Sequence, residues 1–164
     1  MNASRAYIGL GSNLNNPRQQ ILQAFTALDA LPGCRLEAYS TLYQSKPMGP
    51  AQQPDYVNAV AALETLCQPL ELLEQLQEIE RGQGRLRSDE RWAPRTLDLD
   101  LLLYDELQMD TEALVIPHPG LHQRAFVLYP LAEIAPDLNV PALGSLQNLM
   151  EGCPVGNLRK LEER

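Results

Sequence analysis

Apolar positions in the first two thirds of the chain follow two periods. Stretches that are apolar at every position or at every second position predict strands over residues 5–10, 35–43, 56–65 and 97–104. Apolar residues at helical spacing, each series opened by a proline, predict helices over 17–31 and 69–82. The resulting order, β-α-β-β-α-β, is the split βαβ arrangement of a ferredoxin-like α+β fold, an antiparallel sheet with packed helices.

The last third of the chain is less regular. Its pattern predicts a short extended piece over 114–116, interrupted helical turns over 123–135 and a tail punctuated by proline and glycine. No internal repeat, low-complexity tract or serine-glycine linker divides the sequence. Residues 1–164 are therefore expected to form a single domain, in which C-terminal additions follow the ferredoxin-like core.

Composition excludes several classes of protein. The apolar runs fall far short of the roughly 18 residues that a membrane span needs, and the N-terminal residues lack the features of a secretory signal peptide. Cys34, Cys67 and Cys153 are far apart and show no C-x-x-C spacing, which predicts reduced, buried thiols and no zinc site. We therefore expect a cytoplasmic protein that does not bind membranes.

Charge is distributed unevenly along the chain. The formal net charge of −8 argues against nucleic acid or an anionic membrane as a partner. The segment 81–95 differs, because it combines two acidic residues with five of the eleven arginines, namely Arg81, Arg85, Arg87, Arg91 and Arg95. Guanidinium groups grip phosphate oxygens bidentately, so residues 82–95 are suited to a mobile lid over a phosphate chain. A solvated connector is the alternative explanation.

Asp98-Leu99-Asp100 is the sharpest local signal. On a strand the two carboxylates share one face, with Cβ atoms roughly 6–7 Å apart, and like charges on one face repel. Mg²⁺ removes that repulsion and takes one or two carboxylates together with phosphate oxygens and waters. For an isolated pair a solvated strand face is commoner, but the arginine-rich segment directly upstream favours the metal site. On the opposite face of the strand, four leucines are predicted to point into the core, namely Leu97, Leu99, Leu101 and Leu103.

Other residues near this strand are candidates for ligand contacts. Trp92 offers a flat wall for a heteroaromatic ring, although a structural anchor is its default role. Asn58 follows a proline-rich loop over 45–54 and carries both a donor and an acceptor for the edge of an amide-bearing heterocycle. His118 lies between two prolines, where a surface histidine is ordinary, and Phe126 suits a core position equally well.

These stretches resemble one enzyme family. Residues 91–102, Arg-Trp-Ala-Pro-Arg-Thr-Leu-Asp-Leu-Asp-Leu-Leu, are similar to the signature of the 6-hydroxymethyl-7,8-dihydropterin pyrophosphokinases of folate biosynthesis. The similarity continues in order, at compatible spacing, through residues 11–14, 53–59, 80–85, 117–119, 124–128 and 130–136. It therefore spans the chain from about residue 6 to residue 140.

The resemblance implies a ferredoxin-like fold and transfer of pyrophosphate from ATP to the pterin hydroxymethyl group, with release of AMP. Carried over by motif, Asp98 and Asp100 would hold two Mg²⁺ ions on the ATP phosphates, and Arg85 and Arg95 would be catalytic residues beside the reacting phosphates. Further ATP contacts would come from Gln77, Glu80, Arg87, Leu101, His118 and Arg124. The pterin would be bound by Ser45, Met48, Tyr56, Asn58, Trp92 and Phe126.

Some positions depart from the family pattern. Ala93 stands where glycine is usual, and Gly120 replaces an arginine often found after the His-Pro pair, which removes one possible phosphate contact. Ala113 and Val115 lack the polar side chains that some members place before the histidine. These departures concern the lid and one edge of the ATP site, and they leave the carboxylate pair unchanged.

Two other classes of function compete with this interpretation. A ligand-sensing module on a ferredoxin-like fold is one, but it does not require paired carboxylates beside an arginine-rich loop. A two-metal nucleotidyl transferase also uses Asp-x-Asp, but it normally carries a basic track for nucleic acid, which is not expected at a net charge of −8. The leading interpretation implies ATP and the pterin as partners, and we expect a monomer.

Overall fold

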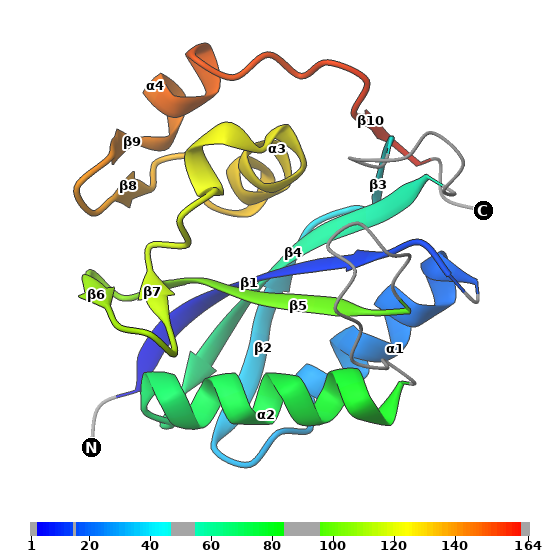
Figure 1. Cartoon of the computed structure of the whole chain (residues 1–164), viewed down its shortest axis with the longest axis vertical. Coiled ribbons are helices and arrows are strands. Elements are labelled where there is room, and N and C mark those ends of the chain that lie inside the picture. Colours follow the sequence, from blue (N-terminus) through cyan, green and yellow to red (C-terminus); the bar gives the residue numbers. More distant parts are fainter. Residues whose placement is uncertain (1–2, 15, 47–54, 84–95, 162–164) are drawn as a thin grey trace.

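The computed structural model describes residues 3–14, 16–46, 55–83 and 96–161, and its centre is an antiparallel sheet. β4 and β1 are the central strands, β5 forms one edge, and β3 followed by β10 forms the other (Figure 1). β2 pairs with the other half of β4. The strands are β1 (Ser4–Ser12), β2 (Cys34–Tyr39), β3 (Tyr43–Ser45), β4 (Tyr56–Thr65), β5 (Asp98–Tyr104) and β10 (Arg159–Lys160).

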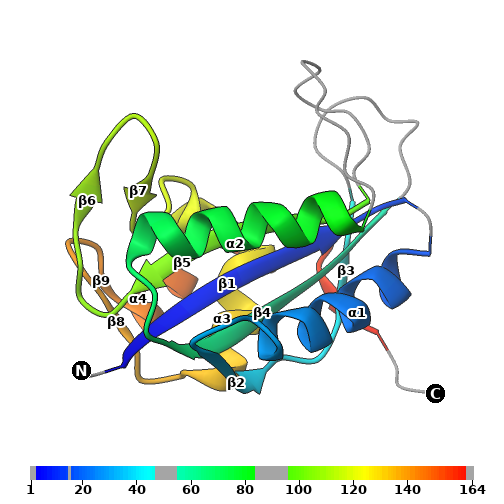
Figure 2. The ribbon, with the colours of Figure 1, turned by 90° about the horizontal axis from the view of Figure 1, so that it is seen from below.

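Helices cover both faces of this sheet. α1 (Pro17–Asp29) and α2 (Pro69–Gly82) pack on one face, and α3 (Ala125–Ile134) packs on the other (Figure 2). Both long helices start at the predicted prolines, whose missing N–H has no partner to lose at the first helical position. Asn16 precedes α1 with a φ of 64°, and its side chain makes no capping bond within the described residues.

The predicted ferredoxin-like α+β core is confirmed, with one change in the second strand. The segment expected as one strand over 35–43 is two strands, β2 and β3, which pair with successive parts of β4. Ser40 lies between them, and its Oγ accepts a hydrogen bond from the Val60 N–H at 3.0 Å while its own N–H donates to Val60 O at 2.8 Å. Side-chain bonding of this kind competes with the strand ladder, and the strand breaks there.

A bulge in β5 changes which leucines face which helix. The register between β1 and β5 shifts so that Leu102 is an extra residue of β5. Leu99 and Leu101 lie in the core against α1 and α2 as predicted, whereas Leu102 and Leu103 both lie in the core against α3. The placement of Leu103 in the same stripe as Leu101 was therefore wrong, because the bulge interrupts the alternation.

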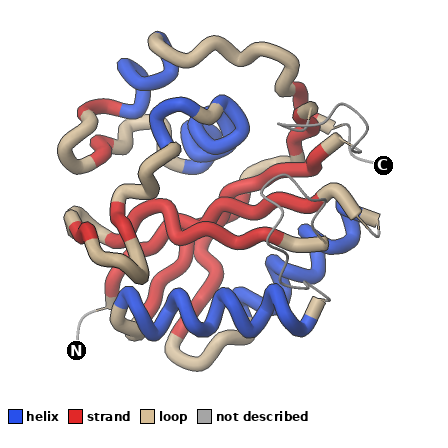
Figure 3. Tube along the Cα trace, viewed as in Figure 1, coloured by secondary structure: helices blue, strands red, loops and turns tan. Residues whose placement is uncertain are grey.

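The C-terminal third wraps around α3 and returns to the sheet (Figure 3). A small hairpin precedes α3, a second hairpin and a short helix follow it, and β10 then pairs with β3. The predicted extended piece is seen as β7, and the interrupted helical turns as η1 followed by α3. These elements are β6 (Met109–Asp110), β7 (Val115–Ile116), η1 (Leu121–Gln123), β8 (Asn139–Val140), β9 (Gly144–Ser145) and α4 (Leu146–Glu151).

The three cysteines are free thiols, and Cys67 and Cys153 are buried, as predicted. Cys34 is half-buried, and its Sγ lies 3.1 Å from Thr65 Oγ1. Within the described ranges, no helix has the length and apolar character required to cross a bilayer.

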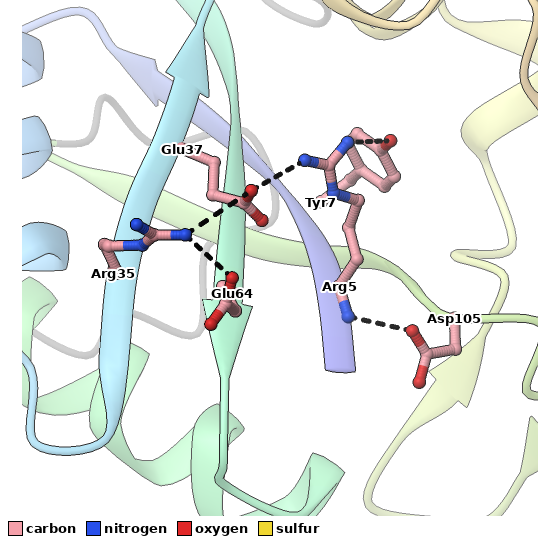
Figure 4. Close-up of polar contacts among 6 residues, drawn as sticks. All are labelled: Arg5, Tyr7, Arg35, Glu37, Glu64 and Asp105. Carbon is pink, nitrogen blue, oxygen red and sulfur yellow. Dashed lines mark hydrogen bonds and ion pairs between the residues drawn. The ribbon is translucent and has the colours of Figure 1, made fainter. Parts of the chain in front are cut away.

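Charged side chains gather where β1 begins and β4 ends, and we call this group the far-end cluster. Its ion pairs run from Arg35 to Glu64 at 2.9 Å, and from Arg5 to Glu37 at 3.0 Å. The Arg5 N–H donates to Asp105 Oδ1 at 2.8 Å. Figure 4 shows how these contacts join three strands. The members are Arg5, Tyr7, Arg35, Glu37, Glu64 and Asp105.

Candidate active site

A cavity of about 550 Å³ opens at the end of the sheet opposite the far-end cluster. The C-terminal part of β1, the end of β3 and the first residues of β4 and β5 form its floor. One side is closed by the last turns of α2, and the other by the first turn of α3 with the turn at His118. Segments far apart in the sequence therefore meet at one end of the sheet.

The cavity brings together most of the described residues that the sequence singled out. Its lining includes Ser45, Tyr56, Asn58, Gln77, Glu80, Asp98, Asp100, His118, Arg124 and Phe126. Leu101 differs, because it is buried in the core against α1 and α2 and does not line the cavity. The other predicted site residues, Met48, Arg85, Arg87, Trp92 and Arg95, lie outside the described residues.

Asp98 and Asp100 lie on the α3 side of β5, where the strand alternation places both carboxylates toward the cavity. In the register of the sheet, Gly11 pairs with Asp98 and Gly9 pairs with Asp100. The described residues contain no cluster of three or more histidine, cysteine or acidic side chains that could hold a metal by themselves. A pair of carboxylates instead fits Mg²⁺ whose remaining ligands are phosphate oxygens and waters.

Gly9 and Gly11 of β1 line the cavity floor and add no side chains to it. Gly11 pairs with Asn58 on one side and Asp98 on the other, so these two side chains stand two strand spacings apart, roughly 10 Å. A Cβ at Gly11 would lie 3.3 Å from Asn58 Nδ2, which is closer than ordinary packing. Glycine inside a strand often marks such a close approach of a ligand or another group.

Glu80 is buried and faces the outer edge of β5. Its Oε2 accepts a hydrogen bond from the Leu99 N–H at 2.7 Å. Leu99 separates the two aspartates, so this bond fixes the backbone between them. The carboxylate that the sequence placed on the adenosine side of ATP thus also anchors the strand that carries Asp98 and Asp100.

The His118 ring is oriented by its own turn. The Gly120 N–H donates to Nδ1 at 3.2 Å, which assigns the proton of the neutral ring to Nε2. Nε2 lies 3.9 Å from Asp100 Oδ1. Burial and the nearby Arg124 guanidinium lower the pKa of His118, and the Asp98 carboxylate opposes them only in part. The imidazole is therefore neutral at pH 7 and presents an N–H to the cavity.

Arg124 and Phe126 lie together where α3 begins. The Arg124 guanidinium carbon is 5.6 Å from the centroid of the Phe126 ring, a cation–π contact. Both residues line the cavity. The pair therefore combines a positive charge with a flat apolar surface.

Ser45 and Asn58 form the opposite wall. The Ser45 hydroxyl donates to Asn58 Oδ1 at 2.7 Å, and both side chains are buried. This bond fixes the amide so that its Nδ2 donor lies on the side of Gly11. Tyr56, two residues earlier on β4, completes this wall.

Sequence reasoning did not assign some lining residues to the site. Lys46 and Arg81 add positive charge to the cavity, and Gly9 and Gly11 form its floor. The glycines carried a signal, because glycine weakens a strand interior and needs a reason to be there. Lys46 carried no such signal, since a single lysine in a proline-rich loop is ordinarily solvated.

Comparisons with known proteins agree on one family. The sequence pattern described as 7,8-dihydro-6-hydroxymethylpterin-pyrophosphokinase (HPPK) matches residues 7–136. The 2-amino-4-hydroxy-6-hydroxymethyldihydropteridine pyrophosphokinase of Pseudomonas aeruginosa is 53% identical over 157 residues, which is 96% of both chains. The Bacillus subtilis protein of the same name is 39% identical over 92% of this chain and 89% of its own.

Among solved structures, Plasmodium falciparum HPPK-DHPS A437G with SDX-DHP has a TM-score of 0.73 and 13% sequence identity. The match covers 98% of this chain and 49% of that one, so the chain spans about half the length of this structure. At this identity the likeness concerns the fold. The sequence matches carry the assignment further: the chain belongs to the 7,8-dihydro-6-hydroxymethylpterin-pyrophosphokinase family of enzymes.

Proposed function

We propose that this protein catalyses Mg²⁺-dependent transfer of pyrophosphate from ATP to the hydroxymethyl group of 6-hydroxymethyl-7,8-dihydropterin, releasing AMP, in folate biosynthesis. Family membership supports the reaction class. The observation that carries the proposal is a single cavity that combines paired carboxylates, positive side chains and a polar-aromatic wall. The carboxylates and positive side chains suit the phosphates of ATP with Mg²⁺, and the polar-aromatic wall suits the pterin ring.

The pterin is proposed to lie between the two walls of the cavity. Phe126 and Tyr56 offer ring faces for stacking, and Asn58 offers its fixed amide to the edge of the heterocycle. Gly11 adds no side chain of its own beside Asn58 and Tyr56, where we propose that the flat ring lies. Ser45 keeps the Asn58 amide in one orientation, and we propose that Met48 and Trp92 add further contacts.

The triphosphate is proposed to lie beside β5. Asp98 and Asp100 would hold two Mg²⁺ ions, which when bound neutralise phosphate charge and polarise the phosphorus under attack. His118 offers its Nε2–H and Arg124 its guanidinium to phosphate oxygens. Gln77 and Glu80, from the last turns of α2, would line the adenosine side, and we keep Leu101 there only as a backbone contact of β5.

Arg85, Arg87 and Arg95 are proposed to complete the charge around the phosphates. The transferred group develops charge in the transition state, so catalysis of this kind depends on positioning and on charge stabilisation. The segment 82–95 would then act as a lid that excludes water, which would otherwise hydrolyse ATP. Because the reaction consumes ATP, we also propose that the protein acts in the cytoplasm.

A product assay tests this proposal. The protein is incubated with ATP, Mg²⁺ and 6-hydroxymethyl-7,8-dihydropterin, and the nucleotides are separated by chromatography. We expect AMP and the pterin pyrophosphate in equal amounts, with no turnover in excess EDTA. Release of inorganic pyrophosphate would indicate a nucleotidyl transferase, and binding of ATP without turnover would indicate a ligand-sensing module; either result would overturn the proposal.

A further inference from the structure

The backbone conformation at position 120 does not require a glycine. Its φ and ψ are −97° and 3°, values that alanine adopts without strain. Gly33, with a φ of 74°, shows the contrast, because there a side chain would be strained. The reason for a glycine at position 120 therefore lies in the space around it.

The Arg124 guanidinium occupies the space in which a side chain at position 120 would lie. A Cβ at Gly120 would be 2.8 Å from Arg124 Nε and 3.0 Å from Arg124 Cζ. Real Cβ atoms essentially never come as close as 2.8 Å to another heavy atom. The guanidinium therefore rests directly on the Gly120 backbone.

Two contacts hold the Arg124 guanidinium in place. Gly120 lies against the guanidinium, and the Phe126 ring lies 5.6 Å from its central carbon. Arg124 is thus held between the turn and α3, with the cavity before it.

We propose that Gly120 is a positioning residue, whose missing side chain leaves the space in which the Arg124 guanidinium is held toward the anionic part of the ligand. The identity of that anion, the phosphate chain of ATP, rests on the proposed function. Gly120 has no side chain with which to contact phosphate itself. The absence of a side chain leaves room for the Arg124 guanidinium and so determines where Arg124 makes its contact.

Gly120→Ala tests this role without disturbing the fold. The atom in the way is the end of a flexible side chain, so the guanidinium moves and the backbone stays. We expect unchanged thermal unfolding and about tenfold weaker binding of α,β-methylene-ATP with Mg²⁺, the scale of one charge-assisted hydrogen bond. Isothermal titration calorimetry measures the binding.

Gly152→Ala is the matched control. Gly152 also has a negative φ, −87°, and the nearest atom to a Cβ there is Leu149 O, at an ordinary 3.7 Å. It follows α4, away from the cavity lining. This variant is expected to bind the nucleotide as the wild type does, so a general effect of replacing glycine by alanine would be visible.

A double-mutant cycle shows whether Gly120 acts through Arg124. Arg124→Ala alone should weaken binding, and adding Gly120→Ala to it should weaken binding no further, because nothing is left to displace. In Gly120→Ala, the NMR signal of the Arg124 Nε–H should also shift, since the guanidinium changes its distance from the Phe126 ring. This signal is assigned by its loss in Arg124→Ala.

The outcomes separate this proposal from the proposed function. If Gly120→Ala binds like the wild type, if its effect adds fully to that of Arg124→Ala, or if the Arg124 signal does not move, Gly120 does not position Arg124. If instead the wild type fails to release AMP but the Arg124 signal shifts as expected, the placement of Arg124 stands and the proposed reaction fails.

Discussion

The two ends of one sheet face use the same kinds of side chain in opposite ways. At the far-end cluster, arginines and carboxylates contact one another, and the contacts drawn in Figure 4 link its members. At the cavity, Asp98, Asp100, His118 and Arg124 all face an open space. Between the two ends, the same sheet face is apolar and is covered by α3.

We propose that this difference separates charges that stabilise the fold from charges that bind a ligand. Ion pairs between exposed groups contribute little, and Arg5, Arg35 and Glu64 of the far-end cluster are substantially exposed. At the cavity, the hydrogen bond from the Leu99 N–H to Glu80, the hydrogen bond within the His118 turn and the space at Gly120 determine where polar groups lie. Substitutions at the cavity should therefore lower binding or turnover, whereas substitutions at the far-end cluster or at the contacts of α3 should change only the free energy of unfolding.

The largest effect is expected at the two aspartates. Asp98→Ala or Asp100→Ala should lower turnover by at least about 10³-fold, since each removes a ligand for a metal that stabilises several kcal/mol of transition-state charge. Circular dichroism should be unchanged, because both side chains leave the core untouched. AMP release is measured with Glu64→Ala as the matched carboxylate at the far end. Near-normal turnover in either aspartate variant would show that the assignment of Asp98 and Asp100 as Mg²⁺ ligands is wrong.

The arginines of the proposed lid come next. Arg85→Ala and Arg95→Ala should lower kcat by roughly 10²-fold, the scale of one charge-stabilising donor, and should change substrate binding less. Arg35→Ala, from the far-end cluster, is the control and should leave kcat unchanged. Single-turnover rates and equilibrium binding are measured together. Weaker ATP binding with an unchanged chemical step would mean that these arginines bind the phosphates but have no catalytic role.

The polar-aromatic wall should affect binding before chemistry. Asn58→Ala or Phe126→Ala should weaken pterin binding by about tenfold or more, as expected for a lost ring contact or buried hydrogen bond of roughly 1–2 kcal/mol. Their single-turnover rate at saturating pterin should stay close to that of the wild type. Fluorescence titration with the pterin measures the binding. A loss confined to the rate would place these residues with the reacting groups.

Glu133 tests the layer between the two ends. It lies on α3 and accepts hydrogen bonds from Thr41 Oγ1 at 2.8 Å and from the Tyr43 hydroxyl at 2.7 Å, and Lys160 Nζ lies 3.8 Å away. Glu133→Gln should lower the free energy of unfolding by about 1–2 kcal/mol, the scale of a hydrogen bond to a charged group. Urea denaturation measures this loss.

The same residue predicts a pH dependence. Burial alone would raise the pKa of Glu133, but hydrogen bonds from Tyr43 and Thr41 and the charge of Lys160 lower it below 4.5. Its contribution to the free energy of unfolding is therefore complete above about pH 4.5 and is lost as the pH falls through the folded pKa. The gap between wild type and Glu133→Gln should narrow on acidification; a constant gap would contradict this account.

The smallest effect is expected at the far-end cluster itself. Arg35→Ala removes exposed ion pairs with Glu64 and Glu37 and should change the free energy of unfolding by about 0.5 kcal/mol or less. That small difference should shrink further in 0.5 M NaCl, because salt screens exposed charges. A loss above about 1 kcal/mol would mean that the ion pairs of the far-end cluster act as a network.

The sequence was sufficient for the central fold because local signals and tertiary structure agree there. The prediction for β4 over 56–65 is confirmed residue for residue, since the strand is rich in valine and alanine and is mostly buried between the two helix layers. The second strand was predicted as one piece because nothing local reveals the contact of Ser40 with Val60. The bulge at Leu102 was equally hidden, because three consecutive leucines fit either face.

For the site, motif spacing predicted which residues meet but not what supports them. Asp98 and Asp100 were placed on the correct face of β5 by alternation alone. The bond from the Leu99 N–H to Glu80 joins elements that only tertiary structure brings together. Leu101 was carried over by motif although its own alternation placed it in the core, and the core is where it lies.

The edge position of β5 has a consequence for self-association. An edge strand presents unpaired N–H and C=O groups to which a strand of another chain can add. Here the Glu80 carboxylate takes the Leu99 N–H, and the His118 N–H donates to Leu102 O at 3.0 Å. Glu80 and the turn at His118 thereby also cap an edge strand with three consecutive leucines, so loosening Glu80 would expose an edge open to strand addition as well as disturb the aspartates.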